Sequence, residues 1–237
     1  MRILIAVVNC HRRLAYQQAI RDTWLPLVSG ADVRFFLGPS EREPKPDEVF
    51  LDCDDTYQGL PSKVRGIVRW AYEHGYDYVL KCDDDCILDS EKLLASDFIS
   101  YDFVGRGNDT RTYPVPMGFC YWLSRKSMAL LIDADLPNNN NDEVWVASNL
   151  AKGNISLHND DRYCLHRGNR NDFIDPEKRP LRPPPPRIVT RNNKNLQQAG
   201  GTFAWCLYIT WLGYRDLPED KNIEEFYRLW KRVGNGK

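Results

Sequence analysis

The sequence lacks any apolar run long enough to cross a membrane, which takes roughly 20 residues. The N-terminal run Ile3–Val8 has 6 residues, is too short for the apolar part of a signal peptide, and is better interpreted as a first strand. No internal repeat is visible, which excludes repeat architectures. We therefore expect a protein without a membrane span.

The sequence also lacks an excess of charge of either sign. Lys and Arg number 32, Asp and Glu number 33, and the formal net charge is −1, so nothing in the overall charge favours nucleic acid or an acidic membrane surface. The seven cysteines are scattered and odd in number, which argues against a disulfide framework and for a reducing compartment. Cys82 and Cys86 lack further soft ligands at zinc spacing, so we expect buried thiols.

What is present is a globular composition, with 42% hydrophobic and 27% charged residues in 237 positions. This length suits one core with a tail. A basic, proline-rich stretch begins near Pro176, with four consecutive prolines at 183–186. We predict one domain over residues 1–175, and a proline-rich segment and C-terminal extension over residues 176–237 that packs back on the core.

Apolar runs of strand length alternate with stretches of helical periodicity in the first third of the chain. Predicted strands occupy residues 3–8, 34–38, 49–51 and 78–80, and predicted helices occupy residues 14–24 and 60–74. Further strands are expected at 102–105, 119–123 and 155–157, and further helices at 91–97, 126–132, 142–153 and 223–233. This alternation with short turns predicts an α/β fold, a Rossmann-like, mostly parallel sheet flanked by helices.

Three consecutive carboxylates, Asp83, Asp84 and Asp85, follow the predicted strand 78–80 directly. Like charges about 4 Å apart repel by roughly 1 kcal/mol in water and by several times more in a partly buried cleft. A divalent cation that carries a diphosphate would relieve this repulsion, because hard cations share carboxylate and phosphate oxygens. Ligands of open α/β sheets bind at the carboxyl ends of strands. The alternative is an acidic surface turn.

Six short motifs occur in order along residues 1–170. They are QAIRDTW at 18–24, FLG at 36–38, DTYQGLPSK at 55–63, YVLKCDDD at 78–85, YP at 113–114 with GFCYWLS at 118–124, and DEVW at 142–145. Together they resemble the motifs of glycosyltransferase family 31, the β-1,3-galactosyltransferase and Fringe-like enzymes. The sequence departs from that pattern with Cys120 at a family glycine and Glu143 at a family aspartate. Residues 176–237 carry no such resemblance.

The resemblance implies the GT-A fold and an inverting transfer from a UDP-sugar, of galactose or N-acetylglucosamine type, to a glycan acceptor, with Mn²⁺ (or Mg²⁺) as cofactor. A metal on the diphosphate suits this chemistry, because it stabilises the departing charge without proton transfer. By family position Asp85 is the direct metal ligand. Asp83 and Asp84 are expected to contact ribose, or the metal through water.

Inversion also needs a base that takes the proton of the acceptor hydroxyl. The family position falls on Glu143, with Asp142 as the alternative; the structural alternative for both is a helix start, where carboxylates suit the dipole. A late histidine is the family's second metal ligand. His166 fits its distance best and His158 is the fallback.

Arginines after the first strand suit contacts to phosphate, since guanidinium binds such groups in a bidentate manner. We expect Arg13, Arg21 and Lys63 on the donor side, although an arginine that pairs with the acidic residues and an exposed helix lysine are the plain alternatives. On the acceptor side we expect Gly118, Trp122 and Trp145, because sugars stack on aromatic faces. As core residues, the two tryptophans need no such role.

Two further hypotheses stay open. The chain could be a non-catalytic nucleotide-sugar or carbohydrate-binding protein, which the glutamate at the base position favours. It could also be a glycosyltransferase for modified nucleic acid, because residues 178–194 are basic, although a solvated loop is the usual interpretation. Lack of an anchor indicates a cytoplasmic enzyme of microbial or viral type, or a Golgi-lumen enzyme if the sequence is trimmed.

Overall fold

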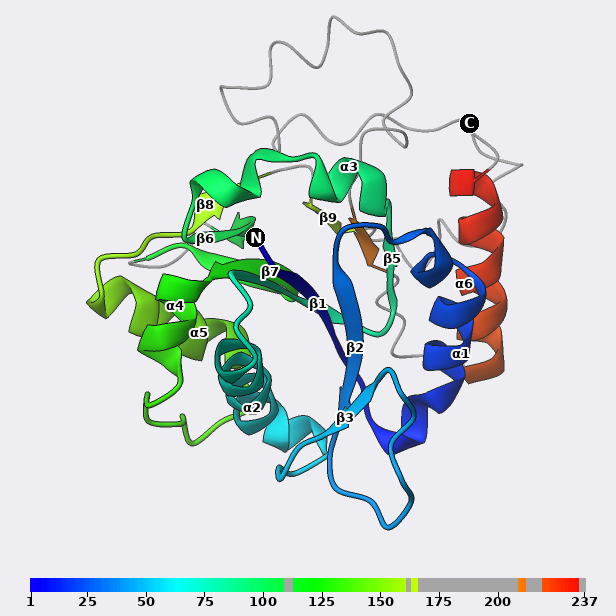
Figure 1. Cartoon of the computed structure of the whole chain (residues 1–237), viewed down its shortest axis with the longest axis horizontal. Helices are drawn as coiled ribbons and strands as arrows, with labels where there is room; N and C mark the ends of the chain where they lie inside the picture. Colours follow the sequence, from blue (N-terminus) through cyan, green and yellow to red (C-terminus); the bar gives the residue numbers. More distant parts are fainter. Residues whose placement is uncertain (109–112, 161–162, 166–208, 212–218, 235–237) are drawn as a thin grey trace, which may run out of the picture.

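A central seven-stranded sheet forms the core of the computed structural model (Figure 1). The structure describes residues 1–108, 113–160, 163–165, 209–211 and 219–234. The sheet has the order β3-β2-β1-β4-β7-β6-β8, with β7 antiparallel to both neighbours and the other pairs parallel. Its strands are β1 (Ile3–Val8), β2 (Asp32–Leu37), β3 (Glu48–Phe50), β4 (Tyr78–Asp83), β6 (Phe103–Asn108), β7 (Val115–Ser124) and β8 (His158–Asn159). The expected mixed, mostly parallel sheet flanked by helices is confirmed.

Helices cover both faces of this sheet, as Figure 1 shows. On one face lie α1 (Leu14–Asp22) and α6 (Glu219–Gly234), and on the other lie α2 (Leu60–Glu73), α4 (Arg125–Leu131) and α5 (Asp142–Lys152). The short helix α3 (Ser90–Leu94) directly follows the strand β5 (Cys86–Leu88). Strand β1 explains why both faces need cover: its alternate residues enter two separate apolar clusters, one with α1 and one with α2.

A three-stranded sheet continues from the end of β4. After Asp83 a two-residue turn leads into β5 (Cys86–Leu88), which pairs antiparallel with β10 (Ile209–Trp211). On its other side β10 pairs parallel with β9 (Tyr163–Leu165). Backbone far apart in the sequence therefore gathers beside the strand that follows the three aspartates.

The C-terminal helix α6 packs on α1. Phe226 is fully buried in the cluster that α1 shares with the sheet, and Ile223, Tyr227 and Trp230 pack against this cluster. The Tyr227 hydroxyl donates to Asp22 Oδ2 at 2.7 Å. The apolar positions recur at intervals of three and four residues, which explains why this stretch forms a helix with one face on the core.

One predicted strand is wrong. Residues 155–157 form no strand, and the pairing with β6 begins only at His158. Ile155 and Leu157 are buried in the cluster around α2 and α5, so the apolar pattern there reflects burial rather than sheet pairing. Among the helices that the structure describes, none is both long and apolar enough to cross a membrane.

Candidate functional site

The three aspartates form a tight turn at the carboxyl edge of the central sheet. Asp83 is the last residue of β4 and pairs in register with Val8, the last residue of β1. Asp84 and Asp85 occupy the turn before β5. Two parallel strands that end side by side bring the loop after β1 against this acidic turn (residues 83–85), which is where open α/β sheets bind ligands.

Asp84 is held by the loop after β1. Arg13 Nε donates to both of its carboxylate oxygens at 2.9 and 3.0 Å, and Arg13 Nη2 donates to Oδ1 at 2.6 Å. Asn9 Nδ2 donates to Oδ2 at 2.6 Å. Arg13 Nη2 also lies 3.7 Å from Asp85 Oδ2. Burial acts to lower the pKa of Arg13, but the hydrogen bonds with Asp84 raise it above its usual value, so this guanidinium stays charged.

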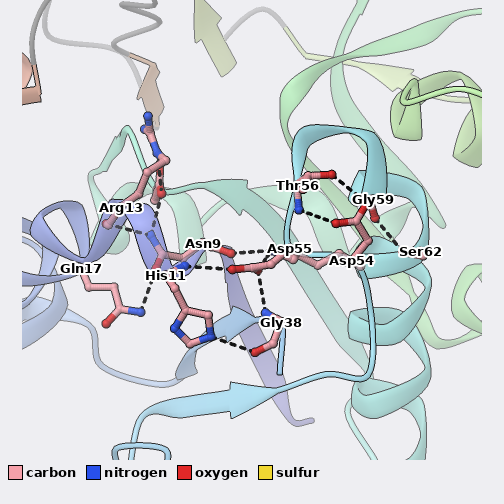
Figure 2. Close-up of polar contacts among 12 residues, drawn as sticks. Asn9, His11, Arg13, Gln17, Gly38, Asp54, Asp55, Thr56, Gly59 and Ser62 are labelled. Atoms are coloured by element: carbon pink, nitrogen blue, oxygen red, sulfur yellow. Dashed lines mark hydrogen bonds and ion pairs between the residues drawn. The ribbon is translucent and has the colours of Figure 1, made fainter. Parts of the chain in front are cut away.

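Asp55 organises the other side of the same loop (Figure 2). Its carboxylate accepts from the backbone N–H groups of His11 and Gly38 at 2.9 and 2.7 Å, and it is paired with Lys63 Nζ. Lys63 is buried and donates also to the Asn9 carbonyl oxygen at 2.7 Å. Burial acts to raise the pKa of Asp55, but the hydrogen bond with Lys63 and the two backbone donors bring it below its usual value. Lys63 thus fixes the loop from within.

Lys81 links the acidic turn to the start of α5. This β4 side chain is 3% exposed, and its Nζ donates to Asp83 Oδ1 at 2.7 Å and to the Gly118 carbonyl oxygen. It lies 3.6 Å from Asp142 Oδ2. Burial acts to lower the pKa of Lys81, but Asp142 and Asp83 raise it well above its usual value. Burial raises the pKa of Asp83 to about 6 although Lys81 opposes the shift.

The two candidates for the base differ in their surroundings. Asp142, the first residue of α5, is buried and accepts from the Tyr121 hydroxyl at 3.1 Å in addition to its ion pair with Lys81. Glu143 is partly exposed and its carboxylate lies beside Gly118, where a Cβ would be 3.3 Å from Oε2. Burial, and next the charge of Asp142, raise the pKa of Glu143. Asp142 is therefore held in place, whereas Glu143 reaches the surface at the same edge.

Arg21 lies elsewhere. It is at the far end of α1 from the acidic turn, where it makes two hydrogen bonds to Asp47 at 2.8 and 2.9 Å. Its Nη2 lies 3.5 Å from Glu48, and its guanidinium covers the ring of Phe35. The structure therefore does not bring Arg21 together with the aspartates, and its contacts join α1 to the segment before β3.

The two tryptophans expected on the acceptor side are core residues. Trp122 is 1% exposed and stacks on Phe98 with 3.9 Å between ring centroids, so it presents no face to an acceptor. Trp145 is buried as well, and its Nε1 donates to the Asp135 carbonyl oxygen at 2.8 Å. It borders a shallow hollow of about 230 Å³ over α5. Gly118 lies next to the carboxylate of Glu143, one of the two candidate bases.

Within the described part of the chain, no three His, Cys, Asp or Glu side chains are grouped to hold a metal by themselves. His166 lies outside the described residues, and His158 stacks on Tyr101 with 3.6 Å between centroids. Mg²⁺-like cations are commonly held by one or two carboxylates with substrate phosphates supplying further oxygens. The donor set of the acidic turn fits a cation of that kind, with Asp83 and Asp85 as the carboxylates that Arg13 does not hold in a bidentate pair.

Sequence reasoning missed the roles of Asn9, Gln17, Lys81 and Tyr121. A lysine inside the apolar strand 78–82 is itself a signal, because a buried lysine needs an anionic partner. Asn9 follows the last residue of a buried strand, where site residues collect. Gln17, which donates to Asn9 Oδ1 at 2.9 Å, and Tyr121 give no such signal, since nothing in the sequence indicates which partner each side chain meets.

Comparisons with known proteins agree with this architecture. No family model matches the chain. A 49-residue segment is 46% identical to UDP-GalNAc:beta-1,3-N-acetylgalactosaminyltransferase 2 of Mus musculus and 44% identical to that of Homo sapiens, and covers 20% of this chain and 10% of each relative. A crystal structure of a glycosyltransferase involved in the glycosylation of the major capsid of PBCV-1 matches with a TM-score of 0.51 at 12% identity, over 96% of this chain and 100% of that one. The chain has the GT-A fold of glycosyltransferases.

Proposed function

We propose that the protein is a metal-dependent, inverting glycosyltransferase that moves a sugar from a UDP-sugar, of galactose or N-acetylglucosamine type, to a hydroxyl of a glycan acceptor. The supporting observation is the link through Lys81, which joins Asp83 of the acidic turn to Asp142 beside Glu143. A site for a diphosphate and a candidate base therefore share one edge of a GT-A sheet.

On the donor side, Asp85 and Asp83 are the proposed metal ligands, with His166 as a further candidate. These carboxylates would hold a divalent cation, which would supply positive charge to the departing diphosphate. Arg13 and Lys63 act indirectly, since both hold the loop after β1 in place.

On the acceptor side, Glu143 is the proposed base. It takes the proton of the acceptor hydroxyl while that oxygen forms a bond to the anomeric carbon and the bond from this carbon to the diphosphate oxygen breaks. A single displacement of this kind inverts the anomeric centre. Asp142 is instead a positioning residue, because Tyr121 and Lys81 hold its carboxylate. Gly118 leaves the space beside Glu143 Oε2 that a side chain would fill.

The test is release of UDP from UDP-galactose and UDP-N-acetylglucosamine with Mn²⁺ and a panel of glycan acceptors. We expect slow donor hydrolysis without acceptor, faster release with the right acceptor, and loss of both in Asp85→Asn. Glu143→Gln should keep UDP binding and lose transfer, by about 10²–10⁴-fold for a missing general base. Equal binding without turnover in wild type and Glu143→Gln would favour a binding protein instead.

Residues 178–194, which motivate a nucleic-acid acceptor, lie outside the described residues.

A further inference from the structure

We infer that Asp84 is a positioning residue and not a donor ligand. Together with Arg13, Asn9 and Gln17 it forms an internal clamp that holds the acidic turn against the loop after β1. The ligand assigned to the acidic turn depends on the proposed function, whereas the clamp itself is inferred from the contacts of these four side chains. It departs from the expectation that Asp83 and Asp84 play the same part.

The carboxylate of Asp84 is already occupied by protein donors. Its Oδ1 receives Arg13 Nε at 3.0 Å and Nη2 at 2.6 Å, and its Oδ2 receives Arg13 Nε at 2.9 Å and Asn9 Nδ2 at 2.6 Å. The residue is 4% exposed. Arginine–carboxylate pairs of this bidentate kind are strong and directional. A ribose or a metal-bound water could reach Asp84 only if these bonds were broken.

The buried side-chain amide of Gln17 fixes the orientation of the Asn9 side-chain amide in the clamp. Gln17 Nε2 donates to Asn9 Oδ1 at 2.9 Å, so the amide nitrogen of Asn9 faces Asp84 and the Arg13 carbonyl oxygen, which lies 3.1 Å away. Gln17 and Asn9 are both buried. The reverse orientation of Asn9 would turn its oxygen toward a carboxylate. The clamp therefore has one consistent set of donors and acceptors, in which both oxygens of Asp84 face donors.

The clamp joins segments that are distant in sequence, since Asp84 is 71 residues from Arg13 and 75 from Asn9. Because Asp84 is fixed, the residues on either side of it are constrained as well. Asp83 pairs with Lys81, and Asp85 lies within 3.7 Å of Arg13 Nη2. The clamp thus holds the two carboxylates proposed as metal ligands without contacting the donor itself.

Arg21, on the helix α1 that follows Arg13 in the chain, provides a matched control. Like Arg13 it makes a two-point pair with an aspartate, Asp47, but its partner lies before β3 rather than in the acidic turn. Loss of either arginine removes a comparable ion pair. Only loss of Arg13 should affect the acidic turn.

The experiment combines two readouts on wild type, Asp84→Asn, Arg13→Met, their double variant, Arg21→Met and Asp85→Asn. The first is hydrogen exchange of the backbone amides of residues 83–88 without ligand. The second is calorimetric titration with UDP in the presence of Mn²⁺. We expect about tenfold faster exchange in Asp84→Asn and in Arg13→Met, which corresponds to a loss of roughly 1.4 kcal/mol of local stability. The double variant should show no further increase, and Arg21→Met should show no change. UDP affinity should fall about tenfold in the same variants, non-additively, and be lost in Asp85→Asn.

Two results would overturn the clamp. One is unchanged exchange of residues 83–88 in Asp84→Asn. The other is a loss of UDP affinity in Asp84→Asn that is as complete as in Asp85→Asn, together with additive effects of Asp84→Asn and Arg13→Met. That result would make Asp84 a direct ligand. If wild type binds no UDP with Mn²⁺, the proposed function fails, and the exchange measurement still decides whether the clamp exists.

Discussion

The carboxylate of Glu143 lies against Gly118, so that a methyl group at Gly118 would be 3.3 Å from Glu143 Oε2. Such a contact is tighter than ordinary van der Waals distance, and the glutamate must move to accommodate it. Gly118→Ala should therefore lower kcat about tenfold, because a displaced base transfers a proton less well, with little change in the KM for the donor. Steady-state kinetics check this, and the substitution should have no further effect in a Glu143→Gln background. A tenfold rise in the donor KM at constant kcat would instead mean that Gly118 contacts the donor.

Glu143 and Asp142 should respond differently to neutralisation. Glu143→Gln is expected to reduce kcat by about 10²–10⁴-fold and to leave the melting temperature nearly unchanged, because its carboxylate is partly exposed. Asp142→Asn should lower the melting temperature more than Glu143→Gln does and should lower kcat less, because it removes a partner of buried Lys81. Kinetics and thermal melts on both variants separate the roles. Activity retained in Glu143→Gln and abolished in a folded Asp142→Asn would make Asp142 the base.

The pH dependence of transfer should report the environment of Glu143. A base works only when ionised, and burial together with the charge of Asp142 raises the pKa of Glu143. The rate should therefore rise with pH through a midpoint above the usual range of a glutamate. Asp142→Asn removes the neighbouring negative charge and should move that midpoint to lower pH. The dependence of kcat on pH checks both statements, and a midpoint that Asp142→Asn leaves in place would contradict the assignment.

Lys81 should be essential for folding stability. Lys81→Met leaves the carboxylates of Asp83 and Asp142 without the cation they share. Removal of one partner from a buried ion pair typically costs about 3–5 kcal/mol in the free energy of unfolding. Urea unfolding monitored by circular dichroism measures this, with Lys126→Met, which breaks an exposed pair with Asp102, as the control. Partial recovery in Lys81→Met/Asp142→Asn is expected, and equal, small losses for both lysines would contradict the buried link.

The C-terminal helix should belong to the same cooperative unit as the sheet. Phe226 is fully buried between α6 and the core, so Phe226→Ala should cost about 3–5 kcal/mol and lower the midpoint for the whole protein. Lys221→Ala on the same helix serves as the control, because it removes only an exposed ion pair with Glu224. Chemical unfolding followed by tryptophan fluorescence tests this. A midpoint that Phe226→Ala leaves unchanged would mean that α6 does not add to core stability.

Much of the sheet could be predicted because its strands are short apolar runs. The first strand was predicted with the bounds that the structure has, Ile3–Val8, since both of its faces are buried and every residue is apolar. The prediction for residues 155–157 failed because buried side chains alone do not distinguish a strand from an irregular segment that packs on the core. Burial of the side chain and pairing of the backbone are separate physical requirements.

The candidate site was harder to predict because its geometry depends on pairs far apart in sequence. The acidic turn and Glu143 could be found from motif positions, and an arginine paired with the acidic residues was one of the alternatives. The sequence does not indicate that Arg13 is that arginine or that Lys81 reaches Asp142. Arg21 and Trp122 matched expected residue types and yet lie in a structural ion pair and in the core. Residue type indicates what a side chain can do, and only the fold decides which partner it meets.

The metal–diphosphate site at the acidic turn is tested most directly by a thermal-shift measurement with UDP, with and without Mn²⁺, on wild type and Asp85→Asn. Ligand at about 100 times its dissociation constant should stabilise the folded protein by roughly 2.7 kcal/mol. UDP should stabilise wild type only when Mn²⁺ is present, and Asp85→Asn should abolish this effect. Failure of UDP with Mn²⁺ to stabilise wild type, or equal stabilisation of Asp85→Asn, would contradict a metal–diphosphate site at the acidic turn.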